Sequence, residues 1–107
     1  MNVLFVCNQN KHRSKTAEEL FKKKFNTKSV GLYGGKLITQ DHLTWANIVF
    51  VMEEEQRKEI ARRYPNLYLQ KKILSLDIPD TYYYNQPDLK ELLKKQFNNL
   101  SIHQIVF

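Results

Sequence analysis

The stretch that decides the fold is Val3-Leu4-Phe5-Val6-Cys7-Asn8-Gln9-Asn10-Lys11-His12-Arg13-Ser14, near the start of the 107-residue chain. An apolar run, rich in valine, leads directly into the only cysteine. Five polar residues then separate Cys7 from Arg13, and a hydroxyl side chain follows at Ser14. After Ser14 the apolar residues recur at helical spacing. The pattern therefore predicts a buried strand, a tight loop and the start of a helix.

A loop that leads into a helix in this way is suited to binding an oxyanion. The first N–H groups of a helix have no intrahelical acceptor, and the positive end of the helix dipole lies beside them. Arg13 adds a planar cation that can hold two phosphate oxygens. The same environment favours the thiolate form of Cys7, which is the nucleophilic form. The loop is predicted to bind a phosphoryl group and attack it, through Cys7 and the phosphate-binding residues Asn8, Gln9, Asn10, Lys11, His12, Arg13 and Ser14.

A plainer interpretation of Cys7 is that it is a small buried apolar residue at the end of a strand. Free cysteine is among the most buried residue types, so this interpretation holds for many single cysteines. Residues 8–13 argue against it here, because six consecutive polar or charged side chains do not line an apolar core. The reactive-thiol interpretation is therefore preferred.

The rest of the chain alternates predicted strands with predicted helices. Continuous apolar runs or β-branched residues predict strands at residues 2–6, 29–33, 48–52 and 72–76. Helical spacing, acidic starts and basic ends predict helices from Ser14 to about Asn26, over 38–45, over 53–63 and from Pro87 to Leu100. Residues 102–107 fit either an edge strand or a docked end. This alternation predicts one α/β domain over residues 1–107, with three α/β/α layers around a four-stranded parallel sheet.

A second group of functional candidates follows the last predicted strand, in Asp77-Ile78-Pro79-Asp80-Thr81-Tyr82-Tyr83-Tyr84. A thiolate that attacks a phosphate ester expels an oxyanion, and a carboxylic acid placed beside it can donate the proton that it needs. Asp77 and Asp80 are both candidates for this acid. The adjacent tyrosines could form the walls for an aromatic ring. A simple turn is the alternative interpretation, because Asp and Pro are common turn residues.

Cys7, Asn10, Arg13 and Ser14 match the pattern Cys-x-x-Asn-x-x-Arg-Ser, which resembles the signature of the low-molecular-weight protein tyrosine phosphatases. The resemblance continues through Trp45–Glu53 and through residues 77–83, in the order of the family. It implies a cysteine-dependent phosphatase that forms a phosphocysteine and needs no metal or cofactor. Carried over residue by residue, the resemblance makes Cys7 the nucleophile, Arg13 the phosphate ligand and Asp80 the acid, with Asp77 as the fallback for the acid. It also implies that Ser14 hydrogen-bonds the thiolate and that Asn10 braces the loop. Tyr82 and Tyr83 would flank the substrate in preference to Tyr84.

The chain departs from the family pattern in three places. The segment between Gly35 and Ile38 is shorter, so a helix and its loop are expected to be missing. Gln9 stands where the family usually has glycine and is expected to strain or narrow the loop. His12 stands where many members have a second cysteine, so a protective disulfide cannot form.

Charge and composition set limits on other functions. The net charge is +6, but the basic residues are spread over several elements, in Lys22-Lys23-Lys24, Arg62-Arg63, Lys71-Lys72 and Lys94-Lys95. We therefore expect attraction for phosphorylated partners and no dedicated nucleic-acid site. Glu53, Glu54 and Glu55 are interpreted as an acidic helix start, with Glu53 paired to Arg57 and Glu54 to Lys58 at i,i+4 spacing, and not as a metal site.

The start of the chain is interpreted as a strand and not as a signal peptide, and no apolar run is long enough to span a membrane. A single thiol fits a reducing, cytoplasmic setting. The expected partner is a phosphorylated protein or a small aryl phosphate. Two alternatives stay open: a catalytically weak phosphate-binding module, and an arsenate-reductase-like enzyme, which would need an external thiol because Cys7 has no cysteine partner in the chain.

Overall fold

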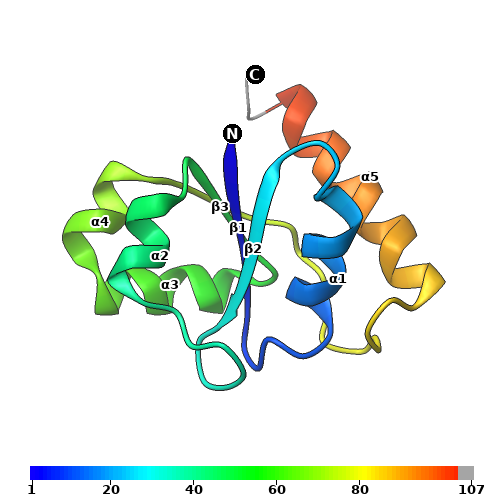
Figure 1. Cartoon of the computed structure of the whole chain (residues 1–107), viewed down its shortest axis with the longest axis horizontal. Coiled ribbons are helices and arrows are strands. Elements are labelled where there is room, and N and C mark those ends of the chain that lie inside the picture. The colour runs from blue at the N-terminus through cyan, green and yellow to red at the C-terminus, as the bar shows by residue number, and fades with distance from the viewer. Residues whose placement is uncertain (104–107) are drawn as a thin grey trace.

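The computed structural model describes residues 1–103, in which four parallel strands form a single sheet (Figure 1). The strands lie in the order β2-β1-β3-β4 and are β1 (Asn2–Cys7), β2 (Asn26–Gly31), β3 (Ile48–Val51) and β4 (Lys72–Ser75). The helices between and after them are α1 (Arg13–Phe21), α2 (Gln40–Trp45), α3 (Glu54–Arg63), α4 (Pro65–Gln70) and α5 (Pro87–His103). The predicted α/β class and the four-stranded parallel sheet are confirmed.

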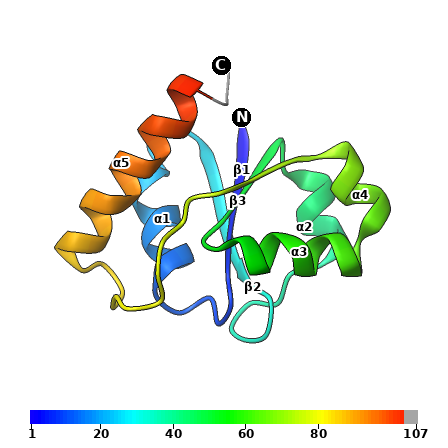
Figure 2. The ribbon, with the colours of Figure 1, turned by 180° about the vertical axis from the view of Figure 1, so that it is seen from behind.

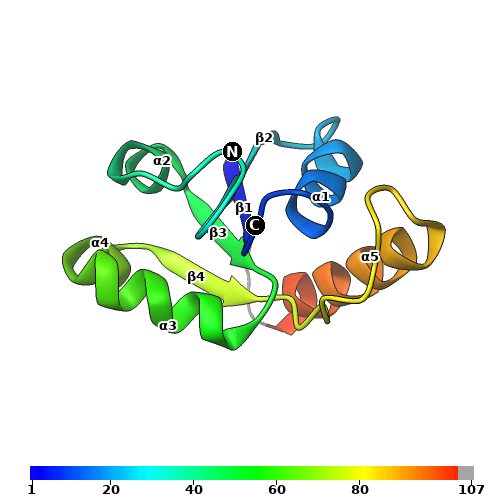
Figure 3. The same ribbon diagram turned by 90° about the horizontal axis from the view of Figure 1, so that it is seen from below.

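Helices cover both faces of the sheet and complete three layers. Strand β1 explains why, because its side chains alternate between the two faces and all of residues 3–6 are fully buried. Val3 and Phe5 pack into a cluster with residues of α1 and α5. Leu4 and Val6 pack into a second cluster with Leu43 of α2 and other residues of the opposite face. Figures 2 and 3 show α1 and α5 together on one side of the sheet and α2, α3 and α4 on the other.

The strand order fixes where a ligand can bind. The chain passes from β1 to β2 on one side of β1, whereas β3 and β4 lie on the other side of β1. The direction in which strands are added to the sheet therefore reverses between β1 and β3. In open parallel sheets, ligands bind at such a point, beyond the carboxyl ends of the strands. Cys7 ends β1 and Glu53 follows β3, so both lie at this point.

Most predicted elements are present, with two boundaries corrected. Helix α1 ends at Phe21 and not near Asn26, because the N–H groups of Lys24 and Phe25 both turn back to the carbonyl of Phe21. Strand β2 therefore begins at Asn26 and ends at Gly31, earlier than the predicted 29–33. Its first residues are polar because it is an edge strand with partly exposed side chains.

The sequence analysis missed helix α4. Pro65 is the first residue of α4, a position where proline is favoured because the N–H group that it lacks would have no intrahelical acceptor. The short segment between Gly35 and Ile38 was expected to lack a helix, and the structure has none between β2 and α2.

Of the segment 102–107, residues 102 and 103 end α5, and residues 104–107 lie outside the described part of the chain. None of the helices described is long and apolar enough to cross a membrane.

Candidate active site

A cavity of about 170 Å³ opens at the carboxyl end of β1. It is lined by Cys7, Asn8, Gln9, Lys11, His12, Arg13 and Asp80. The predicted loop and one of the two predicted carboxylates therefore meet in one place. Over residues 1–103, no group of three or more His, Cys, Asp or Glu side chains is arranged to hold a metal ion.

Cys7 is only 3% exposed and contacts the core cluster between the sheet and α1, yet it also lines this cavity. Its Sγ lies 3.0 Å from Oγ of Ser14, within hydrogen-bond distance. A hydroxyl that donates to sulfur stabilises the thiolate more than the thiol, because the hydrogen bond to a charged acceptor is stronger. The purely structural interpretation of Cys7 does not account for this contact or for its place in the cavity wall.

The backbone between Cys7 and α1 holds a set of unused hydrogen-bond donors. The N–H groups of residues 8–13 donate to no acceptor among residues 1–103, although Asn10 and Arg13 are buried. Buried N–H groups without an acceptor are rare in proteins. Two of the six N–H groups in this loop belong to buried residues, and all six lie beside a thiol and an arginine, an arrangement suited to an anion with several acceptor oxygens.

Asn10 holds the loop in its shape. Its backbone φ is 50°, in the left-handed region that asparagine tolerates better than most residues. Its amide nitrogen donates to Ser14 Oγ at 2.9 Å and to Ser29 Oγ at 3.0 Å, and its amide oxygen accepts from the Lys36 N–H at 3.2 Å. Asn10 thus connects the loop to α1, to β2 and to the segment after β2, which supports the predicted bracing role.

Gln9 does not strain the loop in the way that its replacement of glycine suggested. The residue with positive φ in the loop is Asn10, so position 9 has no need of glycine for its backbone. The Gln9 side chain lies instead against Gly34, where a Cβ atom would collide with Gln9 Oε1. The Gly34-Gly35 turn therefore leaves the room that Gln9 occupies, and Gln9 lines the cavity.

Arg13 is 2% exposed and is fixed from two sides. Its Nη1 donates to Glu53 Oε1 at 2.6 Å and to the carbonyl oxygen of Ile78 at 2.7 Å. Its Nε lies 3.6 Å from Oδ1 of Asp80. Nη2 contacts no acceptor within the described chain, so this nitrogen is the one left to hold an oxyanion in the cavity that Arg13 lines.

Glu53 corrects the sequence analysis. It was expected to pair with Arg57 within α3, but its carboxylate pairs with Arg13 at 2.6 Å, and Arg57 pairs with Glu54 instead. The i,i+4 pair of Glu54 with Lys58 is also wrong, because Lys58 lies nearest Glu55. The signal that points to Glu53 is its place directly after β3, at the same edge of the sheet as Cys7.

Gln56 is a second residue that the sequence analysis missed. It is 2% exposed, and its amide oxygen accepts from the N–H groups of Met52 and Glu53 at 2.8 and 3.1 Å. Its amide nitrogen donates to Asn8 Oδ1 at 3.2 Å. Gln56 therefore connects the start of α3 to the anion-binding loop. A glutamine inside a charged helix carries no sequence signal for this role.

The two candidate carboxylates lie in different surroundings. The side chain of Asp80 is 63% exposed and lines the cavity with Cys7 and Arg13. Asp77 has φ 54° and accepts a hydrogen bond from Ser75 Oγ at 2.8 Å. It lines a separate cavity against α5. The structure brings Asp80, and not Asp77, to the thiol.

The three tyrosines after Asp80 have different environments, and none of them is among the residues that line the 170 Å³ cavity. Tyr82 packs against the core beside α1 and α5. Tyr83 is 75% exposed and meets the His12 ring edge to face, with centroids 5.5 Å apart. The backbone N–H of Tyr84 donates to His12 Nδ1 at 3.0 Å. Their predicted substrate contacts stay a prediction, and Tyr83 and Tyr84 both contact His12 of the loop.

His12 and Thr16 connect the two halves of the site. Besides the bond from Tyr84 to His12, the N–H of Asn85 donates to Thr16 Oγ1 at 2.8 Å, and that hydroxyl donates to the His12 carbonyl at 2.7 Å. The segment that carries Asp80 is thus held to the start of α1 at one end and to Arg13 through Ile78 at the other. His12 was expected as a phosphate-binding loop residue and as the replacement of a cysteine, but its bond to Tyr84 was not predicted.

No protein-family model matches the chain, and no curated protein matches it. Solved structures with the same fold do exist. The tyrosine phosphatase Wzb from Escherichia coli K30, in complex with phosphate, is 18% identical with a TM-score of 0.75 over 96% of this chain and 97% of its own. A low-molecular-weight protein tyrosine phosphatase from T. tengcongensis is 21% identical with a TM-score of 0.74, over 92% of this chain and 93% of its own.

A third similar structure is a cysteine-to-serine mutant of the YwlE arginine phosphatase with a phosphorylated active-site serine. It is 20% identical, with a TM-score of 0.74 over 97% of this chain and 98% of its own. The chain therefore has the fold of the low-molecular-weight protein tyrosine phosphatases over nearly its whole length, as the sequence resemblance implied.

Proposed function

We propose that this chain, built on the fold of the low-molecular-weight phosphatases, is a cysteine-dependent phosphatase that hydrolyses phosphomonoesters, above all phosphotyrosine, through a phosphocysteine intermediate. One observation carries the proposal. Residues 8–13, whose backbone N–H groups have no acceptor among residues 1–103, form much of the wall of a cavity that Cys7, Arg13 and Asp80 line together. A nucleophile, an oxyanion site and a proton donor are the three parts that this reaction needs.

In the first step, the Cys7 thiolate attacks phosphorus in line with the leaving oxygen. An S–P bond forms while the bond from phosphorus to the leaving oxygen breaks, and the Asp80 carboxyl gives its proton to that oxygen. The loop N–H groups and Arg13 Nη2 bind the three equatorial oxygens, whose charge is spread in the transition state. Glu53 and the Ile78 carbonyl keep the guanidinium in place during the step.

In the second step, the Asp80 carboxylate takes a proton from a water molecule that attacks the phosphocysteine. The S–P bond breaks, and inorganic phosphate and the thiolate are released. Ser14, 3.0 Å from the sulfur, stabilises the thiolate as it leaves. The step needs no metal, because Asp80 activates the attacking water and Ser14 stabilises the leaving thiolate.

The similar structures support this reaction class. Wzb was solved with phosphate, and the YwlE mutant carries phosphate on an active-site serine, which indicates a nucleophile that accepts the phosphoryl group in that protein. The set includes tyrosine phosphatases and an arginine phosphatase. We favour phosphotyrosine because Tyr83 lies beside the loop and offers an aromatic surface. A thiolate enzyme also fits the reducing cytoplasm, where such a thiol persists.

The proposal is tested by incubating the wild-type protein with p-nitrophenyl phosphate and following the release of nitrophenolate. Rapid quenching in acid followed by mass spectrometry should show phosphate on the peptide that contains Cys7. A phosphate-binding module without catalysis is the rival function. Tight binding of a phosphopeptide with no turnover of either substrate would favour that rival and contradict the proposal.

Replacing His12 by alanine is expected to lower kcat for phosphotyrosine about 10-fold. The N–H of Tyr84, in the segment that carries Asp80, loses its acceptor Nδ1 of His12, so the general acid is placed less well. The effect on p-nitrophenyl phosphate should be smaller, since its leaving group needs little protonation. The matched control is His12→Asn, whose amide oxygen can replace Nδ1 as the acceptor and should restore most of the rate. Equal losses for both substrates would show that His12 acts on the loop itself and not on the acid.

A further inference from the structure

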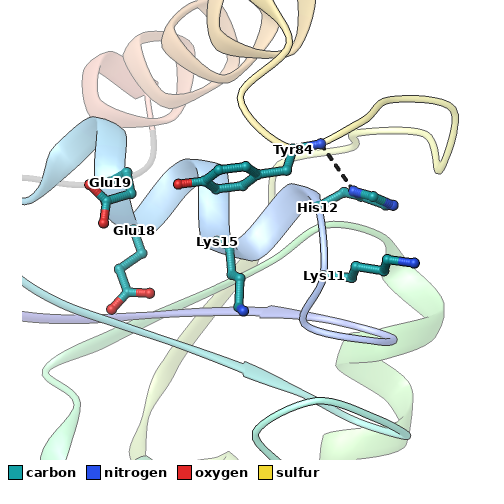
Figure 4. Close-up of a pocket in the computed structure, with 6 residues that line it drawn as sticks. All are labelled: Lys11, His12, Lys15, Glu18, Glu19 and Tyr84. Carbon is teal, nitrogen blue, oxygen red and sulfur yellow. Dashed lines mark hydrogen bonds between the residues drawn. The ribbon is translucent and has the colours of Figure 1, made fainter.

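A second cavity, of about 480 Å³, lies directly beside the candidate active site, along the exposed side of α1 (Figure 4). It is lined by Lys11, His12, Lys15, Glu18, Glu19 and Tyr84, and we refer to these six residues as the α1 groove. Lys11 and His12 also line the 170 Å³ cavity, so the groove continues from the site of the thiol. Its volume is in the range of sites that bind drug-sized ligands, so it can take a few amino-acid residues.

The charges in the α1 groove are not balanced. Lys11 and Lys15 form no hydrogen bond or ion pair with any residue of the described chain, and both are exposed. Of the two carboxylates, Glu19 pairs with Lys22 at 2.7 Å, whereas Glu18 Oε1 accepts from the neutral Ser29 Oγ at 2.6 Å and keeps its negative charge. The groove therefore presents two unpaired cations, Lys11 where the groove joins the thiol cavity and Lys15 farther along it, against the one unpaired carboxylate of Glu18.

The other wall of the groove is aromatic and held in place. The Tyr84 ring lies along α1, with Glu19 and Lys15 beside it, while the Tyr84 backbone is bonded to His12 (Figure 4). The side chain is 47% exposed, so about half of the ring surface is free for contact. A rigid ring opposite two flexible cations is suited to a peptide that offers an apolar or amide surface and a negative charge.

We propose that the α1 groove binds the segment of a phosphoprotein substrate next to its phosphorylated residue, and selects substrates with an acidic side chain in that segment. This inference rests on the proposed function, because it assumes that the phosphorylated residue enters the adjoining cavity. It adds the substrate class, a phosphoprotein with acidic flanks. Nucleic acid is disfavoured, because the groove is short and carries two free cations where a polyanion site needs a longer basic track.

The test compares two phosphotyrosine peptides that differ only in whether the flanking residues are glutamate or glutamine. The wild-type protein should have a kcat/KM about 3- to 10-fold higher for the glutamate peptide, as expected for one or two exposed charge pairs, and the preference should shrink at high salt. In Lys15→Gln this ratio should fall toward 1. In Lys15→Glu it should reverse. The control is Lys58→Gln, on α3 at the opposite face, which removes the same charge and should keep the wild-type ratio.

Two outcomes contradict the proposed role of the groove and leave the proposed function intact. The first is turnover of p-nitrophenyl phosphate together with equal kcat/KM for the two peptides. The second is an equal change, in Lys15→Gln and Lys58→Gln, of the ratio of kcat/KM for the glutamate peptide to that for the glutamine peptide. Absence of any turnover overturns the proposed function instead. In that case the dissociation constants of the same two peptides show whether the groove selects acidic flanking residues. A glutamate preference that depends on Lys15 supports it, and equal dissociation constants overturn it.

Discussion

Replacing Cys7 by serine is expected to lower kcat for p-nitrophenyl phosphate at least about 10⁴-fold, a loss typical of removing an essential nucleophile. The substitution changes one atom and leaves the contact with Ser14 possible, so the fold should be kept. A serine hydroxyl is a much weaker nucleophile than a cysteine thiol at neutral pH, because the thiolate is the reactive form and alcohols hardly form the corresponding anion. The release of nitrophenolate under substrate saturation measures the effect.

The loss is informative only if the cavity still binds an oxyanion. Binding of inorganic phosphate to Cys7→Ser, followed by calorimetry, should stay within a few-fold of the wild-type value, because the loop N–H groups and Arg13 are unchanged. A matched control is Asn98→Ser, at an exposed position of α5 toward its end away from the loop, which should keep full activity. Turnover in Cys7→Ser at the wild-type rate would rule out a thiolate mechanism.

The part of the site that could be predicted is the part that is continuous in sequence. Cys7 and Arg13 lie at the two ends of one loop, where the order of strand, loop and helix start already places both at the same cavity. Residues from other elements, such as Ser29 and Gln56, also hold the loop, but its course from β1 to α1 is set locally. For this reason the pattern was sufficient to predict the local fold of this loop.

The supporting residues could not be predicted, because their roles depend on distances between separate elements. Arg57 and Arg13 were both possible partners of Glu53. Helical spacing favoured Arg57, because Arg13 lies 40 positions earlier in the sequence. The buried guanidinium decides the choice: a buried cation needs a close carboxylate more than an exposed one does. Gln56 and His12 were also not predictable, since each bonds a residue far away in the sequence, Asn8 and Tyr84 respectively.

Asp80→Asn is expected to lower kcat for phosphotyrosine by about 10²- to 10⁴-fold, the usual contribution of a general acid. Asparagine keeps the size of the side chain but has no proton of suitable acidity to give to the leaving oxygen. The matched control is Asp77→Asn, which changes the same group three residues earlier. Asp77 faces Ser75 and not the thiol, so its loss should change kcat less than about 3-fold, as for a residue outside the site.

The size of the Asp80 effect should depend on the leaving group, and this dependence separates proton donation from other roles. Tyrosine has a pKa of about 10 and leaves poorly as an anion, whereas nitrophenolate leaves readily. Asp80→Asn should therefore slow phosphotyrosine much more than p-nitrophenyl phosphate. Asp80 also lies 3.6 Å from Arg13 Nε, so a role in placing the guanidinium is the competing explanation. That role would lower both rates by the same factor, because the oxyanion site serves both substrates equally.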